Sequence, residues 1–160
     1  MRPTTHRLNQ TLLVPLLFAL DRASKVWARQ ALAPEGSVQV LPFFHLTYVE
    51  NSGAAWGILR GSNTLLIGVS VALLAGLLYL RRTWPRENLW SHYGLALVAG
   101  GALGNLYDRI RFGCVVDYLD FLVWPVFNMA DSCITVGAVC LAWGMHLADR
   151  EAAKKKMPAS

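Results

Sequence analysis

Long uncharged runs separated by short polar segments divide the chain. Three of them, at residues 63–80, 88–107 and 132–148, approach the roughly 20 residues that a helix needs to cross a hydrocarbon core about 30 Å thick, and the last is predicted to begin its helix at 128, giving a span of 128–148. A further run at 8–29 is less uniform, because charged residues follow Leu20 and Pro15 can bend a helix there. The pattern predicts an all-α integral membrane protein with four transmembrane helices in a single membrane domain, 1–160.

The connection between the first two runs has a different period. Residues 38–40 and 44–48 alternate apolar and polar positions on either side of Pro42, as short strands do. We therefore expect a small two-stranded sheet within 34–57. The other long connection, 108–127, is rich in carboxylates, aromatic and β-branched residues and is assigned no strand.

Composition favours a membrane protein over a soluble one. Hydrophobic residues make up 54% of the chain and charged residues 16%, against roughly 25% charged in ordinary soluble domains. The net charge of +5 would suit a nucleic-acid partner, but nine of the 15 basic residues lie before the first run, between the second and third, or after the fourth. Seven of the ten acids lie on the opposite side. The positive-inside rule then places both the N- and the C-terminus in the cytoplasm, and no nucleic-acid partner is expected.

The tryptophans agree with this orientation. Three fall near the inner boundary and three near the outer one, as in an interfacial belt: Trp84, Trp90 and Trp143, and Trp27, Trp56 and Trp124. A cleavable signal peptide is the alternative for the first run, with an A-x-A site at 31–33. Because charged residues separate that site from the apolar stretch, the run is interpreted as a retained helix.

The sequence shows no motif typical of a metal site or of a catalytic serine or cysteine nucleophile. The three cysteines and four histidines are scattered, without a C-x-x-C, an H-E-x-x-H or a G-x-S-x-G motif. Ser24 and Lys25 are helix neighbours whose side chains diverge, so they do not form a nucleophile pair. No metal and no cofactor are expected.

Two carboxylates are better candidates, since ionisable groups at membrane depth are costly. Asp131 opens the fourth run, sharing a helix face with Asn128; the alternative is a helix-capping carboxylate. Asp117 lies among apolar residues, and the alternative is a solvated loop acid. Two carboxylates in a partly dry site share one proton, which provides an acid and a base for hydrolysis of an amide. Asp120 is interpreted as a rim residue.

The third run carries small and polar faces. Gly100 and Gly104 predict close helix packing, whereas Gly101, Asn105 and Asp108 form a face that carries polar groups outward to the surface. Arg109 is expected near the acids.

Two further patterns lie in the first and second runs. Asp21 and Lys25, at i,i+4, predict an ion pair. Gly68, Ala72 and Gly76 form a small-residue stripe that predicts helix packing.

Five motifs together resemble the lipoprotein signal peptidases (signal peptidase II) of bacteria, in their order and spacing. They are DRASK at 21–25, NSGAAWG at 51–57, GGALGNLYDR at 100–109, VVDY at 115–118 and FNMADS at 127–132. Departures are mild: Ser52 and Trp56 stand where threonine and phenylalanine are common, and Tyr118 where phenylalanine is common.

This resemblance implies an intramembrane aspartic endopeptidase that cleaves diacylglyceryl-modified prolipoproteins just before the lipidated cysteine. Asp117 and Asp131 would be the catalytic pair, and residues 34–57 an extracytoplasmic β-cradle. The remaining motif residues would bind substrate or support the pair: Asn51, Gly101, Asn105, Arg109 and Asn128, with Asp21 and Lys25 in a structural role. The enzyme would be a monomer in the bacterial inner membrane, in contact with membrane lipid, with its site at the outer face.

A small ion-coupled transporter or channel is the rival interpretation, because intramembrane acids also relay protons. A purely structural membrane subunit does not account for polar motifs gathered at one interface. The sequence leaves open which aspartate is protonated, the substrate preference, the motion of the outer loop, and the roles of His45, Glu50 and Cys114.

Overall fold

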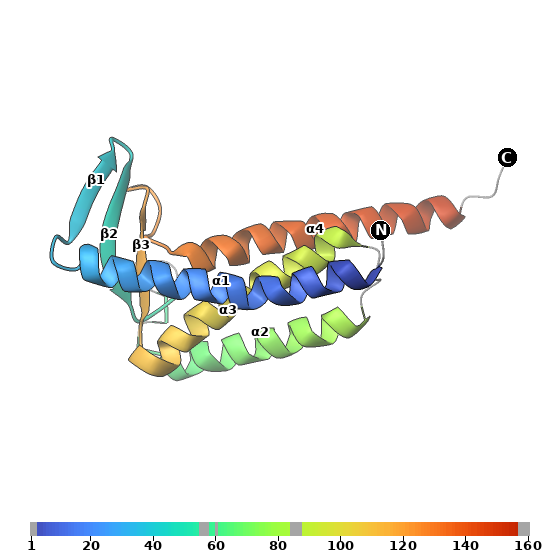
Figure 1. Cartoon of the computed structure of the whole chain (residues 1–160), viewed down its shortest axis with the longest axis horizontal. Coiled ribbons are helices and arrows are strands. Elements are labelled where there is room, and N and C mark those ends of the chain that lie inside the picture. Colours follow the sequence, from blue (N-terminus) through green and yellow to red (C-terminus); the bar gives the residue numbers. More distant parts are fainter. Residues whose placement is uncertain (1–2, 55–57, 60, 84–87, 157–160) are drawn as a thin grey trace.

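Four helices lie side by side, with a small sheet across one end of the bundle (Figure 1). The computed structural model describes residues 3–54, 58–59, 61–83 and 88–156. The helices are α1 (Pro3–Ala31), α2 (Asn63–Thr83), α3 (Leu89–Phe112) and α4 (Met129–Lys156). The strands are β1 (Ser37–Leu41), β2 (Phe44–Asn51) and β3 (Val115–Asp120). The start of α1 and the end of α4 lie at the end of the bundle away from the sheet.

The four predicted runs are all helical, and each helix extends beyond its run. α1 begins at Pro3 rather than 8, α2 continues to Thr83 rather than 80, α3 to Phe112 rather than 107, and α4 to Lys156 rather than 148. Charged residues had marked the predicted ends, yet a helix passes through a charge whose side chain is paired or solvated. α3 ends at Gly113, which has φ +78° and donates its N–H to the Arg109 carbonyl.

Two of these helices, α2 and α4, are long and apolar enough to cross a membrane by length and composition alone. The other two carry buried polar side chains, which lower their mean hydropathy. Among them are Asp21 and Lys25 on α1, and Asn105 and Asp108 on α3.

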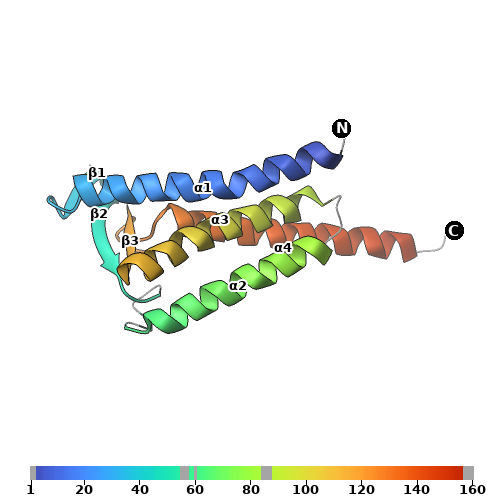
Figure 2. The same ribbon diagram turned by 60° about the horizontal axis from the view of Figure 1, so that its bottom comes forward.

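Helix α3 is the centre of the bundle and packs against the other three helices (Figure 2). Small residues make this possible. A Cβ added at Gly94 would lie 2.8 Å from the carbonyl oxygen of Gly137 on α4, and one added at Gly100 would lie 2.8 Å from Leu17 on α1. The predicted close packing at Gly100 and Gly104 is therefore confirmed.

The predicted packing of the small stripe on α2 is wrong. A Cβ at Gly68 or Gly76 would meet nothing within 4 Å among the described atoms. α2 instead packs through larger side chains, with Leu77 against Leu95 and Val98 of α3. Large apolar side chains bury more area than glycines, so they set the helix's orientation.

These glycines form a matched pair for a stability test. We expect Gly94→Ala to lower the free energy of unfolding by about 1–3 kcal/mol, because its methyl group would press on backbone atoms of α4. Gly76→Ala should leave it unchanged or raise it by up to about 1 kcal/mol, through helix propensity alone. Thermal unfolding in detergent measures both, and equal shifts would contradict the packing at Gly94.

The sheet has three antiparallel strands in the order β1-β2-β3, one more than predicted. The third strand comes from the connection 108–127. Residues 115–118 are all buried, so β3 lacks the alternation that reveals a half-exposed strand. Its pairing places Asp117 opposite Val49, and Val115 opposite Asn51. The last turns of α1 support this sheet, because Ala28 and Leu32 pack against Val116 and Tyr118.

Candidate active site

The first turn of α4 is closed by a reciprocal pair of hydrogen bonds. The backbone N–H of Asp131 donates to Asn128 Oδ1 at 3.0 Å, and the backbone N–H of Asn128 donates to Asp131 Oδ2 at 3.2 Å. This is the capping-box arrangement, so the capping alternative for Asp131 is confirmed. It is not the whole role of the side chain, because Asp131 Oδ1 accepts a further bond from Asn105 Nδ2 of α3 at 2.8 Å.

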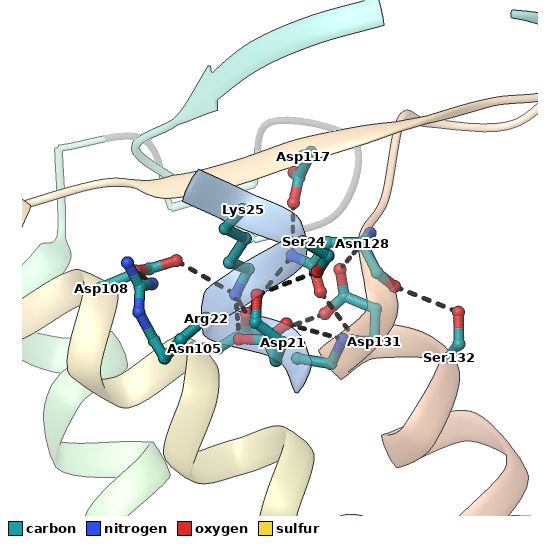
Figure 3. Close-up of polar contacts among 11 residues, drawn as sticks. Asp21, Arg22, Ser24, Lys25, Asn105, Asp108, Asp117, Asn128, Asp131 and Ser132 are labelled. Carbon is teal, nitrogen blue, oxygen red and sulfur yellow. Dashed lines mark hydrogen bonds and ion pairs between the residues drawn. The ribbon is translucent and has the colours of Figure 1, made fainter. Parts of the chain in front are cut away.

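Asp117 reaches the same place from strand β3 (Figure 3). Its Oδ1 accepts from Asn128 Nδ2 at 2.6 Å, and its Oδ2 accepts from Asn51 Nδ2 at 2.9 Å. The residue is only 2% exposed, which rules out a solvated loop acid. Burial, followed by the charge of Asp131, raises the pKa of Asp117 to about 7.

Asn128 joins the two carboxylates. It is wholly buried, its side chain donates to Asp117, and its backbone N–H donates to Asp131. Each of the four carboxylate oxygens therefore accepts one N–H bond, from Asn51, Asn105 or Asn128. The two acids are held in one network, although they lie 14 residues apart in the sequence.

Lys25 fixes the orientation of Asn105 from the side of the amide that faces away from Asp131. Its ammonium group lies 2.7 Å from Asn105 Oδ1, 2.9 Å from Asp21 Oδ2 and 3.0 Å from Asp108 Oδ2, with the side chain 1% exposed. The ion pair predicted between Asp21 and Lys25 is present. Because Lys25 occupies the carbonyl side of the Asn105 amide, the NH₂ group is left to donate to Asp131.

Asp108 corrects a prediction. It was expected to carry polar groups to the surface, but it is wholly buried and pairs with Lys25 and with the Arg22 guanidinium. The reason is the close approach of α1 to α3 at Gly104, where a Cβ would collide with the Asp21 carboxylate. Two acids and two cations then form a charge-balanced group that is buried except for the partly exposed Arg22, and we call this group the ion cluster: Asp21, Arg22, Lys25 and Asp108. Sequence reasoning gave Arg22 no role and placed Asp108 on a polar helix face without recognising either as a member of this cluster; their place inside two motifs was a further signal.

Asp21 and Gly101 support the start of α4. Asp21 Oδ1 accepts the backbone N–H of Ala130 at 3.1 Å, which satisfies a donor that the helix itself cannot. A Cβ at Gly101 would collide with the Ala130 carbonyl. Both residues therefore hold the segment that carries Asn128 and Asp131 against α1 and α3, and neither lines the cavity described next.

Both acids line a cavity of about 240 Å³ whose walls include residues of β2, β3, α3 and α4. Arg109 also lines it, as expected, and donates from Nη2 to the Gly53 carbonyl at 3.0 Å. Its Nη1 is buried and has no hydrogen-bond partner among the described residues. Trp124 and Thr135 complete part of the wall, so the cavity combines two acids, a cation and apolar surface.

Other candidates lie elsewhere. Asp120 accepts bonds from the Thr47 hydroxyl and the Leu122 N–H, and does not line the cavity. Ser24 donates to the Asp21 carbonyl of its own helix. His45 contacts Ser37, and Glu50 accepts from the Tyr48 hydroxyl. Cys114 is a free thiol, and the predicted roles of Trp56, Gly57 and Trp84 fall outside the described residues.

Comparison with known proteins gives one consistent result. Residues 13–147 match the family described as signal peptidase II. A lipoprotein signal peptidase of Pelotomaculum thermopropionicum is 44% identical over 147 residues, covering 91% of this chain and 95% of that protein. One of Desulfitobacterium hafniense is 46% identical over 143 residues, covering 88% and 95%.

Solved structures agree on the fold. A bacterial membrane enzyme determined at 2.3 Å resolution superposes with a TM-score of 0.83 at 30% identity, covering 95% of this chain and 94% of that one. A second bacterial membrane enzyme, at 1.9 Å resolution, gives a TM-score of 0.77 at 31% identity, covering 86% and 92%.

Proposed function

Since this chain belongs to the signal peptidase II family, we propose that it is an aspartic endopeptidase that matures bacterial lipoproteins. Its substrate is a diacylglyceryl-modified prolipoprotein, cut just N-terminal to the lipidated cysteine. One observation carries the aspartic type: Asp117 and Asp131 line the same cavity and are joined through Asn128. No metal or cofactor takes part in the proposed reaction.

The two acids divide the work of hydrolysis. The ionised member takes a proton as water attacks the scissile carbonyl, and the protonated member donates to the carbonyl oxygen as charge develops there. When the tetrahedral intermediate collapses, the C–N bond breaks and the proton taken from water passes to the departing amine. The protonated member recovers its own proton from the new carboxyl group, so the pair ends as it began.

We assign the resting proton to Asp117. Asp131 lies in the first turn of α4, where the partial positive charge of a helix N-terminus favours an anion. Asp117 lies on a strand with no such dipole, is almost wholly buried, and has a pKa raised to about 7. The charges of Lys25 and Arg109 act on Asp117 and favour a pair that is singly, rather than doubly, protonated.

A pH profile tests this assignment. Above about pH 7 Asp117 loses the proton that the reaction needs, so kcat/KM should fall on the alkaline side, approaching tenfold per pH unit. On the acid side it should fall when Asp131 becomes protonated. Initial rates of cleavage between pH 5 and 9 measure both limbs, which are properties of the pair.

Asn51→Ala is the informative variant for this profile. The hydrogen bond from the Asn51 side-chain amide stabilises the charged form of Asp117 and so lowers its pKa. Without that bond the alkaline limb of the profile should move to higher pH. The overall rate can fall as well, because Asn51 lines the cavity. An alkaline limb that stays in place would count against Asp117 as the proton holder.

We further propose that all four helices span the bacterial inner membrane as a single domain, 1–160, with both termini cytoplasmic and the sheet at the outer face. Arg81, Arg82 and Arg150 support this, because they lie toward the end opposite the sheet. Exposed Trp27 and Trp124 suit the outer interface.

The segment 34–54 forms the described part of the β-cradle. α1 is retained, because it supplies Asp21 and Lys25 to the site. We propose a monomer that contacts membrane lipid.

The activity itself is tested with purified protein in detergent. A diacylglyceryl prolipoprotein should be cleaved, with the product followed by gel shift, and the same prolipoprotein without its lipid should serve as the control. Proton flux in liposomes without any cleavage would instead support an ion-coupled transporter. The positions of the acids argue against that outcome. α2 carries no acid along its length, and β3 and the first turn of α4, which carry Asp117 and Asp131, lie at the sheet end of the bundle (Figure 1).

A further inference from the structure

A second cavity, of about 380 Å³, lies between α1, α2 and α3 and shares no lining residue with the aspartate cavity. Its walls are aliphatic, with Val14 from α1, Leu74 and Leu78 from α2, and Ala99 from α3 among them. Among the described residues that line it, two have polar side chains, Arg81 and His92. An apolar groove whose polar groups are confined to one place suits an amphiphilic ligand, and we call this cavity the groove.

The polar groups lie at one end of this groove. His92 is near the start of α3 and Arg81 is near the end of α2, and the two helices are joined there by the short connection that follows Thr83. From His92 the groove follows α3 to Leu103, eleven residues on, which is about 17 Å at 1.5 Å per residue. That length is close to half of the roughly 30 Å hydrocarbon core, the depth of one leaflet.

We propose that this groove binds one acyl chain of an anionic phospholipid, whose phosphate group contacts Arg81 at the end of the bundle opposite the sheet. Basic pockets between transmembrane helices on the cytoplasmic side are suited to anionic headgroups, and Arg81 supplies the positive charge that lines this one. The choice of the inner leaflet rests on the orientation proposed above, whereas the lipid itself is recognised by charge and length.

The charge at the mouth selects this occupant over the signal peptide of the substrate. A signal peptide begins with a positively charged segment, which would lie on the cytoplasmic side, next to Arg81. Like charges in a region of low dielectric repel strongly. A free phosphate ion would contact the arginine side chain but would leave the apolar groove unused.

Lipid binding to the full-length protein tests the proposal without reference to peptidase activity. The protein in detergent is titrated with phosphatidylglycerol, or with phosphatidylcholine of the same acyl chains, and bound lipid is counted by native mass spectrometry. One phosphatidylglycerol should be retained in preference to phosphatidylcholine. Arg81→Ala should weaken its binding about fivefold, the effect of one basic residue at the membrane surface, while Arg81→Lys should largely retain it.

Arg82→Ala is the matched control, since it removes the same charge from the next residue, which does not line the groove. Ala99→Phe fills the groove without changing charge and should abolish retention. Three results would overturn the proposal. The first is equal retention of both lipids, and the second is equal weakening of phosphatidylglycerol binding by Arg81→Ala and by Arg82→Ala. The third is thermal stabilisation of the protein by inorganic phosphate alone that equals its stabilisation by phosphatidylglycerol. A further contrary result would be a raised KM for prolipoprotein in Ala99→Phe with phosphatidylglycerol still bound, because the groove would then hold the signal peptide.

Discussion

The single variants Asp117→Asn and Asp131→Asn should each lower kcat/KM for a diacylglyceryl prolipoprotein by about 10²- to 10⁴-fold. Asparagine keeps the size of the side chain but can neither take a proton from water nor donate one to the carbonyl oxygen. Each variant should still fold, because asparagine keeps a side-chain carbonyl that accepts a hydrogen bond. At position 117 the donor is Asn51 or Asn128, and at position 131 it is Asn105 or Asn128. Thermal unfolding in detergent, run beside the gel-shift assay, separates lost chemistry from lost structure.

Asp120→Asn is the matched control for this pair. Asp120 lies on the same strand as Asp117, three residues on, but bonds Thr47 and Leu122 and stays outside the cavity. Its replacement should leave kcat/KM within about twofold of the original, as expected of a surface change. If Asp117→Asn or Asp131→Asn keeps more than a tenth of the original rate while Asp120→Asn behaves as expected, that acid is not catalytic.

Lys25→Met should be the most destabilising single change in the ion cluster. It leaves Asp21 and Asp108, both almost wholly buried, with Arg22 as the one remaining cation of the cluster, and Arg22 pairs with Asp108. Removing one partner of a buried charge pair typically costs about 3–5 kcal/mol, and we expect a loss of that size from the free energy of unfolding. Activity should fall as well, because the carbonyl side of the Asn105 amide then keeps only the 3.3 Å bond from Asn128 Nδ2 to hold the amide toward Asp131.

Arg29→Met is the matched control for Lys25→Met, since it removes a cation from the next turn of α1. Its partner Glu50 lies 3.5 Å away, and the side chains are 39% and 52% exposed, so this pair should contribute no more than about 1 kcal/mol. A stability loss equal to that of Lys25→Met would contradict the importance of burial.

The double variant Lys25→Met/Asp21→Asn distinguishes a structural role from a positioning role. It neutralises the acid left behind and keeps the Arg22–Asp108 pair, so stability should recover in part. A neutral amide oxygen at position 21 can still accept the Ala130 N–H. If activity stays low while stability recovers, Lys25 acts on Asp131 through Asn105; if both recover together, its role is structural alone.

Much of the site could be predicted from the amino-acid sequence, because its residues stand inside short local motifs. Asn128 and Asp131 are three residues apart at a helix start, so their contact follows from helix geometry. Asp21 and Lys25 are four apart on a helix for the same reason. The helices themselves were predictable, because uncharged runs near membrane length leave a chain few other structures.

Contacts between distant segments were not predictable in this way. Nothing local shows that Asp117 meets Asn128 and Asn51, since that contact depends on the pairing of β3 with β2. The strand itself was missed because both of its faces are buried. The burial of Asp108 depends on how closely Gly104 lets α3 approach Asp21 of α1.

The sequence by itself determined four helical runs, their charge asymmetry and the motif residues of a signal peptidase, because each of these follows from composition or from spacing within one segment. Only the tertiary structure decided which glycines serve packing and which do not, as Gly94 and Gly76 show. It also decided that Asp117 and Asp131 share a cavity, and that an ion cluster behind them orients Asn105. The physical reason is the same in each case: helix spacing is fixed by the backbone, whereas distant contacts are fixed by which surfaces pack together.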